Sequence, residues 1–215
     1  MATKRRSGPA GRAGPLSRAR IIAAAQQLVE RDGVERLTMR GVADEIGTSP
    51  MSLYRHVADK RSLLIGLLEN VAEEIARQPL PTGSDPRQRI IDTLTQTYDV
   101  LAANPWTVQA LLAVQELPPG ALPISEHLVE ALRETGLDDA TAVVAHAAMW
   151  HFVWGQLTFG HLDELTLTAF RRQGSAAGTA YTQLAKIAGT APIVAPREAL
   201  VSGVTALVNG FLPRD

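Results

Sequence analysis

The sequence lacks several features that would point to other classes of protein. Its 215 residues include no cysteine, which excludes disulfide bonds and thiolate metal sites and gives no sign of secretion. No apolar run approaches the ~20 residues needed to span a bilayer. The basic N-terminus is also not followed by the uninterrupted apolar core of a signal peptide. These absences predict a cytoplasmic protein with no membrane partner.

Strand-like alternation and catalytic groupings of side chains are missing as well. Aromatic residues make up only 5% of the chain, and abundant alanine and leucine favour helices over strands. Glycine-rich phosphate loops are absent, and the histidines do not pair at metal-ligand spacing. We therefore expect an all-α protein that is not an enzyme and holds no cofactor or metal.

Charge is distributed unevenly along the chain. Residues 1–61 hold 12 Lys and Arg against 6 Asp and Glu, which leaves 9 against 16 for the remainder. The split suggests that the N-terminal quarter meets a polyanion, although chance clustering plus a solvated tail is an alternative. Residues 1–16 are rich in Gly, Pro, Ala, Arg and Lys without apolar periodicity, which predicts a disordered basic arm.

Helical periodicity begins after this arm. The first helix follows Ser17 and ends at Gly33, and a short second helix follows Thr38 and runs through Glu45. The later helices are expected at 50 to about 56, about 60–77 after the capping residue Asp59, and about 86–103, 105–114, 121–135, 139–161, 177–188 and 197–211. The segment 166–179 contains Gly, Ser and Arg and is predicted to be a loop.

The stretch "GTSPMSLYRHV" contains the most informative of these helices. A tight turn, Gly47-Thr48-Ser49, joins the second helix to a short one that starts at Pro50, and both pack on the first helix as a helix-turn-helix unit. Ser49 suits the N-cap and Pro50 the first helical position. Leu53 and Val57, at i and i+4, form an inward apolar ridge. The outer face, which has no acidic residue, is then free to enter a major groove.

The side chains of that outer face suit duplex DNA. Small Ser52 permits close approach, Met51 matches a thymine methyl group, and Arg55 matches guanine or a phosphate. Donors suited to phosphate oxygens are carried by Tyr54, His56 and Lys60, the last at a helix N-terminus. Two alternatives stay open, since Tyr54 can also be a half-buried packing residue and His56 a cap of its own helix.

The stretch "RIIAAAQQLVERDGVERLTMRGVADEIGTSPMSLYRHVADKRSLL" closely resembles the DNA-binding domain of the tetracycline-repressor (TetR) family. The shared features are the Gly-terminated first helix, Thr-x-Arg opening the second, and Leu-Tyr-x-His-Val-x-x-Lys after the turn. The resemblance implies that Thr38 and Arg40 meet the DNA backbone or a flanking base. The candidate DNA-binding residues are Thr38, Arg40, Ser49, Pro50, Met51, Ser52, Tyr54, Arg55, His56 and Lys60. The basic side chains near the N-terminus, Lys4, Arg5, Arg6, Arg12, Arg18 and Arg20, either enter a minor groove or belong to a solvated tail.

The larger half has one notable cluster, "HAAMWHFVWGQLTFGH" (146–161). It is either plain core with an oligomer interface or part of an apolar pocket with a few polar groups. The resemblance, which is loose here, implies both effector binding and dimerisation. Candidate pocket residues are Trp106, Gln109, Met149, Trp150, His151, Trp154, Gln156 and Phe159. Helices 140–157 and 199–212 are the expected dimer faces, with Ala145, Ala147, Ala148, Gly155 and Gly203 allowing close approach.

Together these patterns predict three parts: the arm (1–16), a helix-turn-helix DNA-binding domain (17–62), and a helical effector-binding and dimerisation domain (63–215). The favoured function is a homodimeric, sequence-specific transcriptional repressor. A small, apolar or aromatic-containing effector would release it from a palindromic operator in double-stranded DNA. The alternatives are a ligand-independent DNA-binding protein and, from another class, a helical small-molecule carrier or enzyme.

Overall fold

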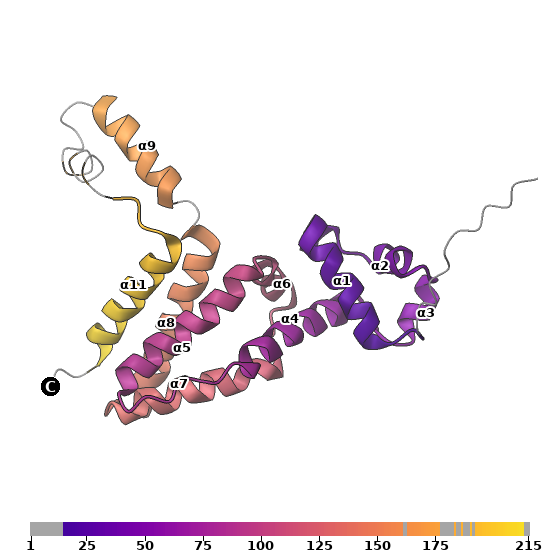
Figure 1. The fold of residues 1–215 in the computed structure, drawn as a ribbon, viewed down its shortest axis with the longest axis horizontal. Helices are drawn as coiled ribbons and strands as arrows, with labels where there is room; N and C mark the ends of the chain where they lie inside the picture. Colours follow the sequence, from indigo (N-terminus) through magenta and orange to yellow (C-terminus); the bar gives the residue numbers. More distant parts are fainter. Residues whose placement is uncertain are drawn as a thin grey trace, which may run out of the picture. The chain divides into compact units, whose positions relative to one another are not determined.

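The fold consists of helices throughout the part of the chain that the structure covers. The computed structural model describes residues 15–160, 163–176, 183, 186, 190 and 192–212 (Figure 1). Within these residues every regular element is helical, so the predicted all-α fold is confirmed. The chain divides into two compact units, Met1–Leu63 and Leu64–Asp215, and the division falls inside helix α4 (Lys60–Arg77). Most of the predicted arm (1–14) lies outside the described residues.

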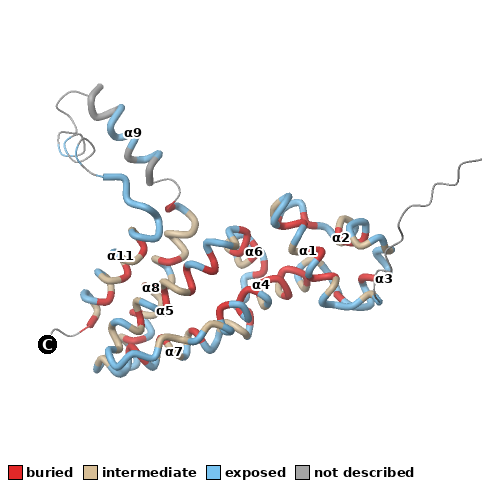
Figure 2. The backbone as a smooth tube through the Cα atoms, viewed as in Figure 1, coloured by how far each residue is buried: buried red, intermediate tan, exposed pale blue. Residues whose placement is uncertain are grey.

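The first unit is built from α1 (Arg18–Asp32), a short 3-10 helix η1 (Val34–Arg36), α2 (Met39–Ile46) and α3 (Pro50–Tyr54). Helix α1 packs against η1 and α2, and α2 packs against α3. Their inward side chains form one small apolar core (red in Figure 2), which includes Ile21, Ile22, Ala25, Leu28, Val29, Leu37, Val42, Ala43, Leu53 and Val57. The helix-turn-helix arrangement that the spacing predicts is therefore present.

Local capping sets the ends of these helices. The hydroxyls of Ser17, Thr38 and Ser49 each accept a hydrogen bond from a backbone amide of the first turn that follows, as N-caps do. Gly47 ends α2 with φ +76°, a left-handed conformation that favours glycine. Helix α3 ends at Tyr54, slightly earlier than expected, and the amides of His56 and Val57 both donate to the Leu53 carbonyl just beyond its end.

The second unit contains the remaining helices. They are the rest of α4, α5 (Pro86–Ala103), α6 (Trp106–Val114), η2 (Pro119–Ala121), α7 (Leu122–Glu134), α8 (Asp139–Phe159), α9 (Asp163–Ala176) and α11 (Pro196–Phe211). Helix α5 packs against α7, α8 and α11, and α8 packs against α6, α7 and α11, so α5 and α8 are central to the core. No helix among the described ranges is long and apolar enough to cross a membrane.

The expected loop at 166–179 is wrong over most of its length, because α9 (Asp163–Ala176) is helical there. Gly174 and Ser175, which suggested a loop, fall in its last turn, where weak helix formers cost least. The stretch before them contains neither glycine nor proline, so nothing interrupts the helix. The helix expected at 177–188 lies outside the described residues, apart from isolated positions.

Asp138 at the start of α8 makes the stability of the second unit dependent on pH. Its Oδ1 accepts the Thr141 amide at 2.8 Å, and the hydrogen bonds from Thr141 hold the carboxyl pKa below its ordinary 3.8. A lowered pKa in the folded state stabilises the protein above the unfolded pKa, and this contribution is lost as the pH falls through the folded pKa. We expect Asp138→Ala to lower the melting temperature at about pH 7, and the difference from wild type to shrink at acidic pH as the pH falls through the lowered pKa of Asp138.

The adjacent Asp139 provides the control for this experiment. Its carboxylate pairs with Arg133 at 3.0 Å, and both side chains are mostly exposed. Because a solvated ion pair contributes little to stability, Asp139→Ala should melt close to the wild type at both pH values. Equal destabilisation by the two substitutions would contradict the capping role of Asp138.

Candidate nucleic-acid interface and internal cavity

Helix α3 is held to the first unit by the predicted apolar ridge. Leu53 is completely buried and Val57 is 3% exposed, so the expectation that both face inward is confirmed. The short helix contributes few hydrogen bonds of its own, and burial of these two side chains therefore determines which face it turns outward.

The outer face of α3 presents donors and apolar surface without an acidic group. Met51 is 74% exposed and Tyr54 50% exposed. The Arg55 guanidinium lies 3.5 Å from the Ser52 hydroxyl, which is itself 3.0 Å from the Ser49 hydroxyl. From residue 46 to residue 58 the sequence has no Asp or Glu. Such a surface has the shape and charge to approach a polyanion.

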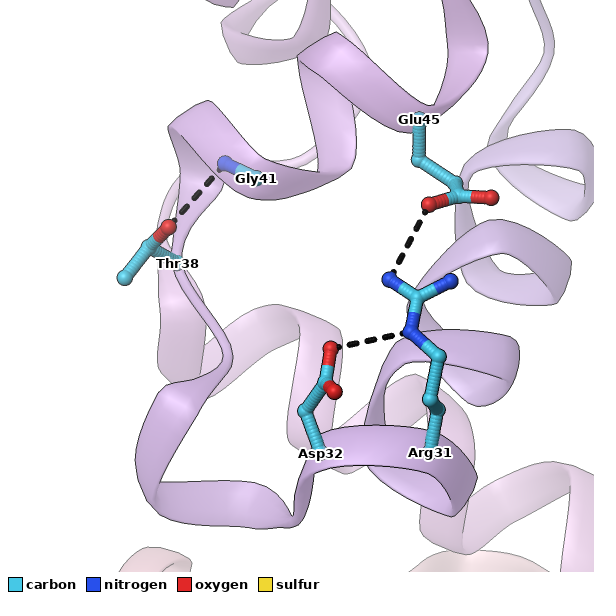
Figure 3. Close-up of polar contacts among 5 residues, drawn as sticks. All are labelled: Arg31, Asp32, Thr38, Gly41 and Glu45. Atoms are coloured by element: carbon cyan, nitrogen blue, oxygen red, sulfur yellow. Dashed lines mark hydrogen bonds and ion pairs between the residues drawn. The ribbon is translucent and has the colours of Figure 1, made fainter.

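Further cations and donors flank this helix. Arg40 is exposed and has no hydrogen bond or ion pair within the described residues. The Thr38 hydroxyl accepts the Gly41 amide at 3.0 Å (Figure 3), which leaves its own proton available for an acceptor. Lys60 is half-buried, and its ammonium donates to the Glu35 carbonyl at 3.3 Å. That bond fixes the Lys60 side chain at the start of α4.

An exposed ion-pair group connects α1 with α2. As Figure 3 shows, the Arg31 guanidinium lies between the carboxylates of Asp32, at 3.1 Å, and Glu45, at 3.3 Å. These hydrogen bonds raise the pKa of Arg31, and the bond to Asp32 contributes most. The group pairs two acidic residues of the first unit with Arg31, so neither carboxylate is paired with the cations around α3.

The second unit contains a partly open cavity of about 240 Å³. It is lined by α4 (Leu68, Val71, Ala72, Ile75), α5 (Thr97, Leu101), α6 (Thr107, Leu111), the segment before α7 (Leu117, Pro118, Ala121), α7 (Ile124, Ser125) and α8 (His146, Trp150, Trp154). The lining is mostly apolar, with a few hydroxyls and one imidazole. This composition is typical of sites for small organic ligands.

Three rings of α8 form an aromatic wall on this cavity, defined here as His146, Trp150 and Trp154. The two indoles are stacked, with centroids 6.0 Å apart and planes at 26°. The Trp150 indole N–H donates to Nε2 of His146 at 3.0 Å, so the imidazole proton is on Nδ1. Burial lowers the pKa of His146, which keeps this ring neutral at about pH 7.

Residues 21–67 match a family described as bacterial regulatory proteins of the tetR family. These residues cover α1 to the first half of α4, which is the part of the chain that forms the helix-turn-helix unit. The chain belongs to the TetR family. Because the family consists of regulatory proteins, the match agrees with the prediction that the chain is not an enzyme.

Two relatives extend the similarity beyond the helix-turn-helix unit. This TetR-family chain is 35% identical over 154 residues to an HTH-type transcriptional regulator from Saccharopolyspora erythraea, covering 69% of this chain and 64% of the relative. It is 32% identical over 127 residues to the HTH-type transcriptional repressor DrrR1 from Streptomyces coeruleorubidus, covering 59% of this chain and 47% of the relative. The chain thus spans less than two thirds of the length of either relative.

The whole fold is similar to a solved structure. A possible TetR family transcriptional regulator from Streptomyces coelicolor A3(2) superposes with a TM-score of 0.75 at 27% identity, covering 90% of this chain and 98% of that one. The similarity includes both helical units, so the second unit also has the architecture of a TetR-family protein.

The candidate DNA-binding residues of this TetR-family protein lie at the start of α2, along α3 and at the start of α4. All except Ser52 and Lys60, which are half-buried, are exposed: Thr38, Arg40, Ser49, Pro50, Met51, Tyr54, Arg55 and His56. Their roles toward DNA stay predictions. Arg18 and Arg20, assigned to the basic segment, are instead on α1, where Arg20 donates to the Ile46 carbonyl at 3.3 Å and so braces α1 against α2.

Two of the eight candidate pocket residues, Trp150 and Trp154, line the cavity. Met149 and Trp106 are buried elsewhere in the core, and Gln109, His151 and Phe159 are exposed. Gln156 donates to the Pro196 carbonyl at 3.4 Å and thereby links α8 to α11. The structure therefore does not bring these residues together around one cavity.

Four residues that line the cavity were not among the predicted pocket residues: His146 and the hydroxyl residues Thr97, Thr107 and Ser125. The signal for His146 was its spacing. It precedes Trp150 and Trp154 by four and eight residues, which places the three rings on one helix face. The hydroxyl residues carried no comparable signal, because each comes from a different helix and sits among apolar neighbours.

Proposed function

We propose that the chain is a cytoplasmic, homodimeric transcriptional repressor that binds a palindromic DNA operator and is released by a small-molecule effector. The observation that carries this proposal is the state of α3. Its inner side chains are buried while Met51, Tyr54 and Arg55 are exposed on a face without acidic residues. A helix anchored in this way is suited to the major groove of DNA.

The proposed contacts follow from the chemistry of each side chain. The first residues of α3, together with Arg55, face base edges, where Met51 meets a thymine methyl group and Arg55 a guanine or a phosphate. Tyr54, His56 and Lys60 hold phosphates on either side. The bond from Lys60 to the Glu35 carbonyl supports this assignment, because it orders the ammonium before DNA arrives.

Dimerisation follows from the small size of one reading helix. A single α3 contacts only a few base pairs, whereas two related by a two-fold axis read a palindrome. Helix α8 supports this proposal with an outward apolar surface, since Val143 is 62% exposed, Val144 58% and Phe159 62%. Such a surface is suited to burial against the same helix of a second chain.

The cavity supports release by an effector over ligand-independent binding, because side chains do not fill it. Helix α4 contributes four lining residues in the second unit and begins in the first. A ligand that contacts α4 is therefore placed to shift the helix-turn-helix units of the two chains of the dimer. It does so only to the extent that it binds the DNA-free state more tightly. The relative DrrR1 is named a repressor, and we propose the same direction of control here.

Selection of bound duplexes from a random pool by the full chain tests this proposal. We expect the enriched sequences to contain two inverted half-sites with centres about 34–36 Å, or a multiple, apart. Enrichment of a single half-site would contradict the dimer, and no enrichment over the starting pool would contradict sequence-specific binding.

Substitution of Arg55 and Lys60 separates base contacts from phosphate contacts. Arg55→Ala is expected to change the preferred base at one position of each half-site, at a cost of about 1–3 kcal/mol if Arg55 reads a base. Lys60→Ala is expected to weaken binding evenly for all sequences and to reduce the salt dependence. Fluorescence anisotropy with the selected duplex and single-base variants, at several salt concentrations, measures both effects. An even loss for Arg55→Ala would make Arg55 a phosphate contact, and an unchanged salt slope for Lys60→Ala would contradict its assignment.

A further inference from the structure

The lining of the cavity excludes one large class of ligands. None of its sixteen residues carries a formal charge at neutral pH, because the only titratable side chain among them is His146. This imidazole stays neutral, since its Nε2 accepts the Trp150 indole N–H. A carboxylate or ammonium group placed here would lose its water without gaining a counter-charge, which costs far more than apolar burial returns. The cavity is therefore suited to uncharged molecules.

The aromatic wall favours a flat molecule. Trp150 and Trp154 stack with a small interplanar angle of 26°, and His146 meets Trp150 edge-on at 68°. A planar ring system that joins such a stack gains dispersion and quadrupole attraction beyond its buried area. The volume of about 240 Å³ lies just below the ~300–1,000 Å³ that is usual for sites of drug-sized ligands. The ligand is consequently compact.

One hydroxyl on the cavity wall, that of Thr97, faces the space that a ligand would occupy. Thr97 on α5 is 2% exposed and lines the cavity, yet its hydroxyl makes no hydrogen bond to any residue that the structure describes. Thr95, on the same helix, donates to the Ile91 carbonyl at 2.7 Å, and Thr107 donates to the Asn104 carbonyl at 2.8 Å. A hydroxyl that lines a cavity and has no protein partner can still donate or accept a hydrogen bond, so an oxygen atom on the ligand would gain a hydrogen bond that the protein leaves open.

Given the effector-released repressor proposed above, on which this inference rests, we propose the chemical class of the effector. It is an uncharged, compact, planar aromatic molecule with a hydroxyl or carbonyl oxygen. The rings stack on Trp150 and Trp154, and the oxygen forms a hydrogen bond with Thr97.

A matched series of probes tests each part of this description by isothermal calorimetry with the full chain. The series is 2-naphthol, its anionic analogue 2-naphthoate, its saturated analogue decahydro-2-naphthol, and naphthalene, which lacks the oxygen. We expect 2-naphthol to bind more tightly than each of the others by on the order of tenfold or more. Equal or tighter binding of 2-naphthoate overturns the inference about charge. If decahydro-2-naphthol binds as tightly as 2-naphthol, the inference that the effector is planar is overturned. If 2-naphthol shows no detectable binding, the proposed ligand class as a whole is overturned.

Thr97→Val examines the hydroxyl alone, because valine has nearly the same shape. We expect this substitution to weaken 2-naphthol binding by on the order of tenfold and to leave naphthalene binding unchanged. Thr95→Val is the matched control, since Thr95 is on the same helix but does not line the cavity, and it should leave both affinities unchanged. An unaltered 2-naphthol affinity for Thr97→Val would overturn the hydrogen bond to Thr97.

The same probe separates this inference from the proposed function. Anisotropy with the selected duplex, repeated with 2-naphthol present, reports release of DNA. Selective binding of 2-naphthol with no release contradicts effector control and supports the ligand class. Specific DNA binding by a chain that does not bind 2-naphthol contradicts the ligand class and leaves the DNA-binding proposal standing.

Discussion

Leu53→Ala is expected to destabilise the first unit by about 2–5 kcal/mol and to abolish operator binding. Leu53 is completely buried, and it attaches a five-residue helix that has little stability of its own. The first unit is also small, and small domains bury a limited fraction of their surface and are marginally stable. A cavity at this position therefore removes a large share of the stability of the unit that carries the reading helix.

Met51→Ala is the matched control, because it also removes apolar atoms from α3. Met51 is 74% exposed, so the unfolding transition should shift by no more than about 0.5 kcal/mol. Its effect is expected on DNA, as a weaker preference for thymine at one position of each half-site. The pair therefore separates the residue that holds α3 in place from one that faces the groove.

The two units can be followed separately in urea. All three tryptophans, at positions 106, 150 and 154, belong to the second unit, so tryptophan fluorescence reports that unit alone, whereas circular dichroism reports both. Leu53→Ala should shift part of the circular dichroism transition to lower urea concentration and leave the fluorescence transition unchanged. Wild-type stability by dichroism, or wild-type affinity for the selected duplex, would contradict the anchoring role of Leu53.

Much of the first unit can be predicted from sequence because its signals act over a few residues. Ser49 and Pro50 start α3, Gly47 stops α2, and Leu53 and Val57 are one turn apart on the buried face. Each of these signals is local chemistry. What local chemistry does not reveal is the bond from Lys60 to the Glu35 carbonyl, which depends on how distant parts of the unit meet.

The cavity could be predicted only as a region. Helix α8 is apolar on nearly all sides, so its sequence does not show which face lines a pocket. The predicted pocket residue His151 follows Trp150 directly and so points roughly 100° away around the helix. His146, one turn before Trp150, shares its face. The lining residues between Leu68 and Ser125 come from five other segments, which are brought together only by tertiary packing.

Gly203 shows how tertiary packing changes the meaning of a small residue. The sequence predicts that this glycine allows helices 140–157 and 199–212 to approach a second chain closely. In the structure, a Cβ atom at Gly203 would lie 2.1 Å from Cζ of Phe152 on α8, so the phenyl ring of the same chain occupies the space that glycine leaves. Helices α8 and α11 are in contact within the chain, and this glycine permits that contact.

Gly203→Ala is therefore expected to destabilise the second unit. Overpacking against Phe152 should cost an amount toward the upper end of the ~1–3 kcal/mol usual for overpacked sites, which outweighs the ~1 kcal/mol that alanine normally contributes over glycine inside a helix. Gly210→Ala, on the same helix, is the control, because no atom lies within 4 Å of its would-be Cβ, and it should be neutral or slightly stabilising. The tryptophan fluorescence transition in urea measures both substitutions.

Combining Gly203→Ala with Phe152→Ala tests the cause of the destabilisation. Phe152→Ala destabilises by itself, because it removes packing between α8 and α11, but it also removes the ring that alanine at 203 would meet. In this background Gly203→Ala should be neutral or stabilising, so the effect of the same substitution changes sign. If Gly203→Ala destabilises equally in both backgrounds, contact with Phe152 is not the cause. If it instead destabilises only the dimer, as measured by the concentration dependence of unfolding, the glycine serves the interface between two chains.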